Sequence, residues 1–273
     1  MPFDKSQQSK QTLISKKKAR SNQVKGERNY RVSMTGQLEE YDDDAPSPLW
    51  IQFLRFCLGM ILLIPCIAVT LQIINQFGLL EPTVAFYEKT PAFFFGVGTV
   101  CCVLIHLVPA FRELLLKPYV WGHEATHAVF VFLCYGRVSE FDSSTEGGYI
   151  IANRDNILVA LSPYVFPIWM AVVGILYVVL GCFLEVSTFI EYFYLLCGST
   201  WAFNLIWTVL MIPLGQSDLR NNGTFFSLTV IYLSNALFLS ILLRATLQES
   251  GNYFDWLFQL VNAHLDVIQV FFR

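Results

Sequence analysis

The long apolar runs constrain this chain more than any other feature. A helix needs about 20 apolar residues to cross a hydrocarbon core about 30 Å thick. Hydrophobic residues make up 55% of the sequence and charged residues only 14%, whereas an ordinary soluble domain carries about 25% charged residues. The pattern therefore predicts an all-α fold, a polytopic transmembrane helical bundle of about six spans. The six candidate segments are residues 50–74, 92–111, 118–134, 157–184, 186–212 and 224–243.

The two ends of the chain differ from this apolar middle. Nine of the 18 basic residues fall within the first 31 positions, and an acidic run from Glu39 to Asp44 follows. Such a composition predicts a disordered arm over residues 1–45 that the membrane domain, residues 46–250, does not need for folding. Residues 251–273 have apolar positions at helical spacing, which predicts an amphipathic interfacial helix. We expect the lipid bilayer, and no nucleic acid, as a partner, because nothing downstream continues the basic surface.

A polar stretch separates the third and fourth apolar segments. It contains the two short β-like runs GRVSEF and GGYIIA, with polar residues 142–146 between them. This pattern predicts a β-hairpin directly after the third segment. Polar backbone of this kind can lie at membrane depth only where protein or water satisfies its hydrogen bonds.

The third apolar segment carries the motif His123-Glu124-Ala125-Thr126-His127, an HExxH sequence. Residues four apart share one face of a helix, so His123 and His127 can bind one Zn²⁺ ion. Glu124 lies on the adjacent face, where it can act as the general base of a hydrolytic reaction. Three ionisable residues are costly in an apolar helix without a compensating partner, and a metal ion supplies one.

Catalytic zinc usually has three protein ligands, and HExxH provides two. One solution places a glutamate on a later helix, which here would be Glu185 or Glu191. The other solution is a distant Asp or His. Residues 201–226 bear on this choice because they form an apolar run with Asn204, a break at Pro213 and a polar turn with Asp218.

Together these features resemble the site-2 protease superfamily of membrane metalloproteases. The resemblance covers about residues 118–226 and rests on HEATH, on the Gly136-Arg137-Val138 step into the hairpin, and on the Asn–Pro–Asp segment. The usual family turn has Asp-Gly, whereas this chain has Asp-Leu. The sequence SPYVFP, residues 162–167, is also similar to a feature of a smaller bacterial branch. The resemblance implies residence in a bacterial inner membrane.

The resemblance also implies an activity: zinc-dependent cleavage of peptide bonds in membrane-protein or peptide substrates. On this basis we expect Glu124 as the catalytic base and Asp218 as the third metal ligand beside His123 and His127. An extended substrate would pair with the GGYI strand, because a helical substrate hides its peptide bonds. The expected substrate-binding residues are Gly147, Gly148, Tyr149 and Asn204.

Two other functions stay open at this point. A prenyl-protein-type membrane metalloprotease also uses HExxH, but with a glutamate such as Glu191 as third ligand. The second alternative is not an enzyme: the chain could be a catalytically inactive scaffold or a transporter. The intact Glu124 argues against this alternative. The side of the membrane that the site faces is also open. The basic N-terminus favours a cytoplasmic start, and alternation through the first five segments would then place Asp218 on the opposite side. The family's sites, however, tend to face the cytoplasm.

Overall fold

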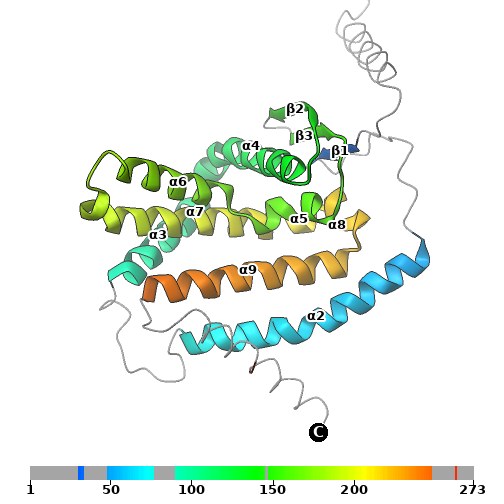
Figure 1. The fold of residues 1–273 in the computed structure, drawn as a ribbon, viewed down its shortest axis with the longest axis horizontal. Helices are drawn as coiled ribbons and strands as arrows, with labels where there is room; N and C mark the ends of the chain where they lie inside the picture. The colour runs from blue at the N-terminus through cyan, green and yellow to red at the C-terminus, as the bar shows by residue number, and fades with distance from the viewer. Residues whose placement is uncertain (1–29, 34–47, 77–89, 145–146, 248–261, 263–273) are drawn as a thin grey trace, which may run out of the picture.

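The structure, a computed structural model, describes residues 30–33, 48–76, 90–144, 147–247 and residue 262. Helices make up most of this part of the chain, and one small sheet lies against them (Figure 1). In chain order the elements are β1 (Tyr30–Ser33), α2 (Leu49–Gln76), α3 (Thr90–Leu107), α4 (Pro109–Leu133), β2 (Val138–Ser144), β3 (Gly147–Ala152), α5 (Ile157–Val165), α6 (Ile168–Gly181), the 3₁₀ turn η2 (Val186–Phe189), α7 (Ile190–Met211), the 3₁₀ turn η3 (Ile212–Leu214), α8 (Ser217–Asn221) and α9 (Thr224–Leu247).

Three helical stretches are long and apolar enough to cross a membrane, at residues 49–74, 186–214 and 224–246. The count rises to five if each of two bent helix pairs is one span. The six predicted spans are therefore not confirmed. The second and third predicted segments correspond to α3 and α4, which meet at an angle of 110°. The break falls at Val108, because Pro109 suits the first turn of a helix but cannot continue the preceding one.

The fourth predicted segment is also divided. Helices α5 and α6 are bent by 73° at Phe166 and Pro167. Only Pro167 separates the two helices, since Pro163 lies inside α5.

Helices α2 and α9 lie side by side and run in the same direction (Figure 1). The hydroxyls of Thr70 and Tyr232 are 2.7 Å apart. Further along both helices, the Gln76 amide donates to the Ser240 carbonyl at 3.1 Å, and the Ser240 hydroxyl donates to the Gln76 side-chain oxygen at 2.9 Å. Residue numbers rise together on the two helices, so both begin at the same end of the molecule. Six full crossings in strict alternation would make the first and last spans antiparallel.

Helices α3 and α7 approach each other closely through small residues. A Cβ atom on Gly98 would lie 2.0 Å from the Leu195 carbonyl oxygen, and one on Gly198 would lie 2.0 Å from the Phe95 carbonyl oxygen. The Ser199 hydroxyl also donates to the Gly98 carbonyl at 3.0 Å. Small residues at such positions let the helix backbones approach closely in apolar surroundings.

The sheet has the strand order β1-β3-β2, and both pairings are antiparallel. The hairpin of β2 and β3 confirms the strands predicted after the HExxH helix. The third strand is unexpected, because residues 30–33 were assigned to a disordered arm. The rest of residues 1–45, and residues 251–273 apart from 262, lie outside the described part of the chain.

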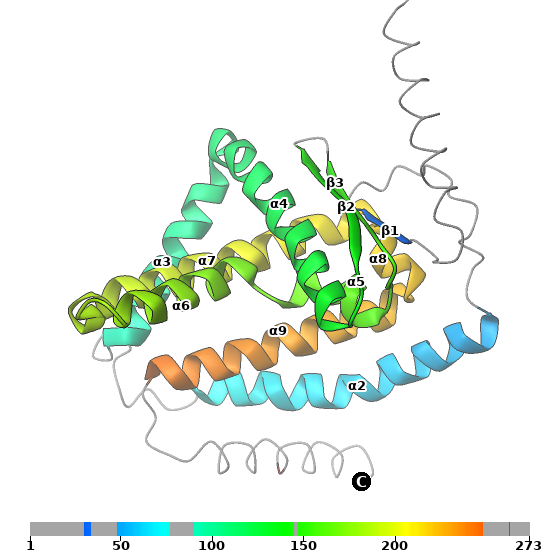
Figure 2. The ribbon, with the colours of Figure 1, turned by 45° about the horizontal axis from the view of Figure 1, so that its top comes forward.

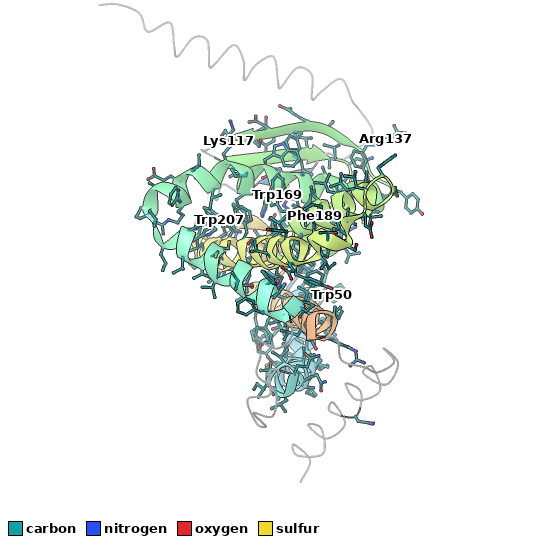
Figure 3. All side chains as sticks on the ribbon, turned by 90° about the vertical axis from the view of Figure 1, so that its left-hand side faces the viewer. Trp50, Lys117, Arg137, Trp169, Phe189 and Trp207 are labelled. Carbon is teal, nitrogen blue, oxygen red and sulfur yellow. The ribbon has the colours of Figure 1, made fainter. Side chains whose placement is uncertain are left out.

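The sheet packs on α4 and α5 through a small apolar core. Val131 of α4, Ile150 and Ala152 of β3, and Val159 of α5 form this cluster, and all four are fully buried. Figure 3 shows the sheet at one edge of the molecule and α2 at the opposite edge. The cluster fixes β3 against the helix that carries the HExxH motif.

Candidate metal centre

The two histidines of the motif project from one face of α4. His123 and His127 are 2% and 0% exposed, and their Nε2 atoms lie 3.2 Å apart. The spacing of four residues brings them together, because such residues lie one above the other on a helix. The sequence-based expectation of a histidine pair therefore matches the geometry.

Asp218 reaches this pair from α8, more than 80 residues later in the sequence. Its Oδ2 atom lies 3.5 Å from Nε2 of His127 and 3.9 Å from Nε2 of His123. The chain turns back after α7 through η3 and through Gly215, whose φ of 73° is left-handed. Such a conformation favours glycine. This turn brings the loop with Asp218 back toward the histidines.

The three residues form a buried group that could hold a metal ion, with one ligand atom from each and all three atoms within 4.8 Å of one another. Tetrahedral zinc with bonds of about 2.0–2.1 Å to nitrogen places its donors about 3.3–3.4 Å apart. The observed separations of 3.2, 3.5 and 3.9 Å are close to that spacing. In the described part of the chain, this is the one such group of three or more His, Cys, Asp or Glu residues.

Charge also favours a cation here. Burial alone would raise the pKa of Asp218, but its contacts with the imidazoles of His123 and His127 outweigh burial and lower the pKa to about 2. The carboxyl is therefore ionised at neutral pH. A buried carboxylate between two imidazoles matches the ligand types that zinc prefers.

Each ligand is held by a further group. His127 donates from Nδ1 to the Val159 carbonyl of α5 at 2.8 Å, which leaves its Nε2 lone pair directed at the centre. The Tyr119 hydroxyl lies 3.3 Å from Nδ1 of His123. The Tyr164 hydroxyl donates to Oδ2 of Asp218 at 3.2 Å. Such outer contacts orient metal ligands and fix the histidine tautomer.

The sequence analysis missed the roles of the two tyrosines. Tyr119 lies four residues before His123, so the same helical spacing that pairs the histidines could have identified it. Its ring stacks on Trp207 of α7 at 4.6 Å. Tyr164 was considered only in connection with the bend of its helix. Its partner is 54 residues away in sequence, and no local pattern indicates that contact.

Glu124 lies on the adjacent face of α4, fully buried and packed against β3. A Cβ atom on Gly148 would lie 2.6 Å from its Cγ and 2.9 Å from its Oε1. Glycine at position 148 therefore lets the strand backbone approach the carboxylate directly. Glu124 is thus next to His123 in α4 and packs against the sheet through Gly148.

The other three expected substrate-binding residues are Gly147, Tyr149 and Asn204. Gly147 opens β3 with a φ of 131°. The Tyr149 hydroxyl donates to Glu140 of β2 at 2.6 Å. Asn204 is half-buried on α7, and a different residue, Asn235 of α9, donates to the Tyr164 carbonyl at 2.8 Å.

The alternative third ligands do not join the centre. Glu185 and Glu191 are exposed and lie at the start of α7, before and after η2. Asp218 is the acidic residue that approaches the histidines. Of the two solutions that the sequence left open, the geometry therefore favours the aspartate.

The chain was also compared with models of known protein families, with curated proteins and with solved structures. None of these comparisons gave a match.

Proposed function

We propose that this chain is a multi-pass membrane zinc metalloprotease of the site-2 protease type, which hydrolyses peptide bonds of membrane-protein segments. The observation that carries the proposal is the convergence of His123, His127 and Asp218 on one point, with Glu124 beside them and Gly148 of β3 against Glu124. His123, His127 and Asp218 would hold the zinc ion, and a set of three protein ligands is typical of catalytic rather than structural zinc.

The bound metal ion and Glu124 would have different roles in hydrolysis. A bound zinc ion supplies Lewis acidity to a peptide carbonyl and to water. Glu124 takes the proton of the attacking water and then transfers it to the leaving amine. Burial of the centre strengthens these electrostatic interactions, because the local dielectric is lower than that of water.

A membrane setting for this chemistry rests on the apolar helices. Three to five of them can cross a membrane, and their outward faces carry large exposed apolar side chains such as Trp50, Phe53 and Leu104. Apolar surface of this extent is typical of contact with lipid. We place the chain in a bacterial inner membrane on the resemblance of its motifs.

Five crossings, in which α3 and α4 form one span and α5 and α6 form another, remove the conflict over sidedness. Parallel α2 and α9 fit the first and fifth of five alternating spans. Arg55 near the start of α2 donates to the Asn221 carbonyl at the end of α8, at 2.8 Å. The start of the first span and the loop with Asp218 therefore lie at the same end of the molecule, which is the cytoplasmic end if the basic arm is cytoplasmic.

The test replaces the base and leaves the ligands in place. Purified Glu124→Gln should keep about one zinc per chain and cut a doubly tagged single-span membrane substrate about 10²–10⁴-fold more slowly than the wild type, the usual contribution of a general base. Glu113→Gln is the matched control, because Glu113 lies on the exposed part of the same helix. Proteolysis that survives in Glu124→Gln, or wild-type protein without zinc, would contradict the proposal.

A further inference from the structure

Both edges of the strand β3 are occupied. On one side β3 pairs with β2, its hairpin partner. On the other side it pairs with β1, which comes from the N-terminal region more than 100 residues earlier. The register joins residues 30, 31, 32 and 33 to residues 152, 151, 150 and 149. The edge at which an extended peptide would add to the sheet is thus filled by the chain itself.

The direction of β1 leads toward the metal centre. Because the pairing is antiparallel, β1 runs from Ala152 toward the start of β3, and its last residue, Ser33, lies opposite Tyr149. The next position of β3 is Gly148, which contacts Glu124. On its other side β1 lies beside α8, the helix of Asp218 (Figure 2). A strand on this edge therefore lies between β3, whose Gly148 packs against Glu124 of α4, and α8, which carries Asp218.

We propose that residues 30–33 are a built-in competitor for the substrate-binding edge of β3, so that a peptide substrate must displace β1 before it can reach Glu124. The assignment of this edge to substrate rests on the proposed protease function. Strand addition suits the chemistry because main-chain hydrogen bonds hold a peptide extended and expose its peptide bonds. A tethered strand competes strongly, since a short linker gives it an effective concentration of about millimolar.

The main experiment removes the strand's pairing in the full-length chain. Proline cannot donate a backbone hydrogen bond, and adjacent residues of a strand direct their N–H groups to opposite sides. Arg31→Pro combined with Val32→Pro therefore removes a donor facing β3 whichever residue supplies it. The control, Ser21→Pro with Asn22→Pro, places the same two prolines earlier in the N-terminal region. The probe is a fluorescein-labelled peptide with the sequence of residues 27–36.

We expect the 31/32 proline variant to bind the peptide at least tenfold more tightly than the wild type and the 21/22 control, with an unchanged zinc content. Equal binding by all three proteins would overturn the proposal. Loss of zinc in the 31/32 variant alone would also overturn it, because β1 would then be a structural strand of the centre.

A second variant holds β1 in place. Arg31 and Ile151 are directly paired, so Arg31→Cys with Ile151→Cys should form a disulfide that peptide mapping identifies. The oxidised protein should lose peptide binding and recover it on reduction, and either single substitution is its control. Peptide binding that is unaffected by the disulfide would contradict the displacement of β1.

The two proposals fail in different ways. If zinc and Glu124-dependent cleavage are present but the proline variant binds and cuts no better than the wild type, only the competitor role of β1 is wrong. If the peptide results hold and no variant contains zinc or cuts a substrate, the protease function is wrong and β3 is a peptide-binding edge with its own occupant.

Discussion

Gly148→Ala tests whether the sheet positions Glu124, the proposed catalytic base. A methyl group at this position would lie 2.6 Å from Cγ of Glu124, whereas non-bonded carbon atoms prefer about 3.5–4.0 Å. The Glu124 side chain must therefore move by about 1 Å to restore an ordinary contact distance. Because it is fully buried, it cannot do so by turning into open space. A misplacement of about 1 Å in a catalytic group can lower the rate about 10²-fold. Overpacking should also lower the free energy of unfolding by about 1–3 kcal/mol.

The assay separates the base from the metal. We expect Gly148→Ala to retain about one zinc per chain, because the three atoms nearest to the new methyl group belong to Glu124 and Asp142, and to cleave the tagged substrate about 100-fold more slowly. Gly174→Ala on α6 is the control, since nothing lies within 4 Å of a Cβ atom there. Wild-type cleavage by Gly148→Ala would refute the positioning argument. Loss of zinc would refute it too, because α4 rather than the Glu124 side chain would then have moved.

Three further predictions concern the ligands and the topology. Asp218→Asn should lose most of its zinc in metal analysis of the purified protein, whereas Glu191→Gln should keep it; the opposite result would favour a glutamate ligand. Tyr164→Phe should weaken zinc binding about 10–100-fold in a chelator competition, the usual effect of removing a contact to a ligand; the control Tyr177→Phe should not, because the Tyr177 hydroxyl donates to the Val186 carbonyl. A membrane-impermeant thiol reagent should label Arg220→Cys from the same side of sealed vesicles as an N-terminal tag, and labelling from the other side would exclude five crossings.

The sequence predicted the residues of the candidate metal centre better than the course of the helices. His123, Glu124 and His127 depend on helical spacing alone, which a sequence displays directly. Asp218 was identified by resemblance, and the fold then showed that Gly215 turns its loop back toward the histidines. The number of spans was not predictable in this way, because hydropathy measures length and polarity but not direction. A break at Val108 turns the chain by 110° within an apolar region.

Contacts between residues far apart in the sequence were also not predicted, and the reason is physical. Tyr164 and Asn235 are ordinary polar residues within apolar helices, where either could serve a plain interhelical hydrogen bond. Their roles depend on which helices become neighbours, which is set by packing across the whole bundle. Asn204 was chosen on the resemblance, as the asparagine in the helix before Asp218, and its contact with substrate stays a prediction.

The strand β3 links most of these features, because successive residues of the strand alternate between buried and half-buried positions. Its residues 148, 150 and 152 are buried toward α4, so glycine at 148 admits Glu124 while Ile150 and Ala152 anchor the strand in the apolar core. Backbone groups at its edges are not engaged by that packing and remain available for pairing. One edge pairs within the hairpin, whereas the other pairs with a segment far away in sequence. Under the two proposals, this six-residue strand would both position Glu124 and offer an edge at which a peptide replaces β1.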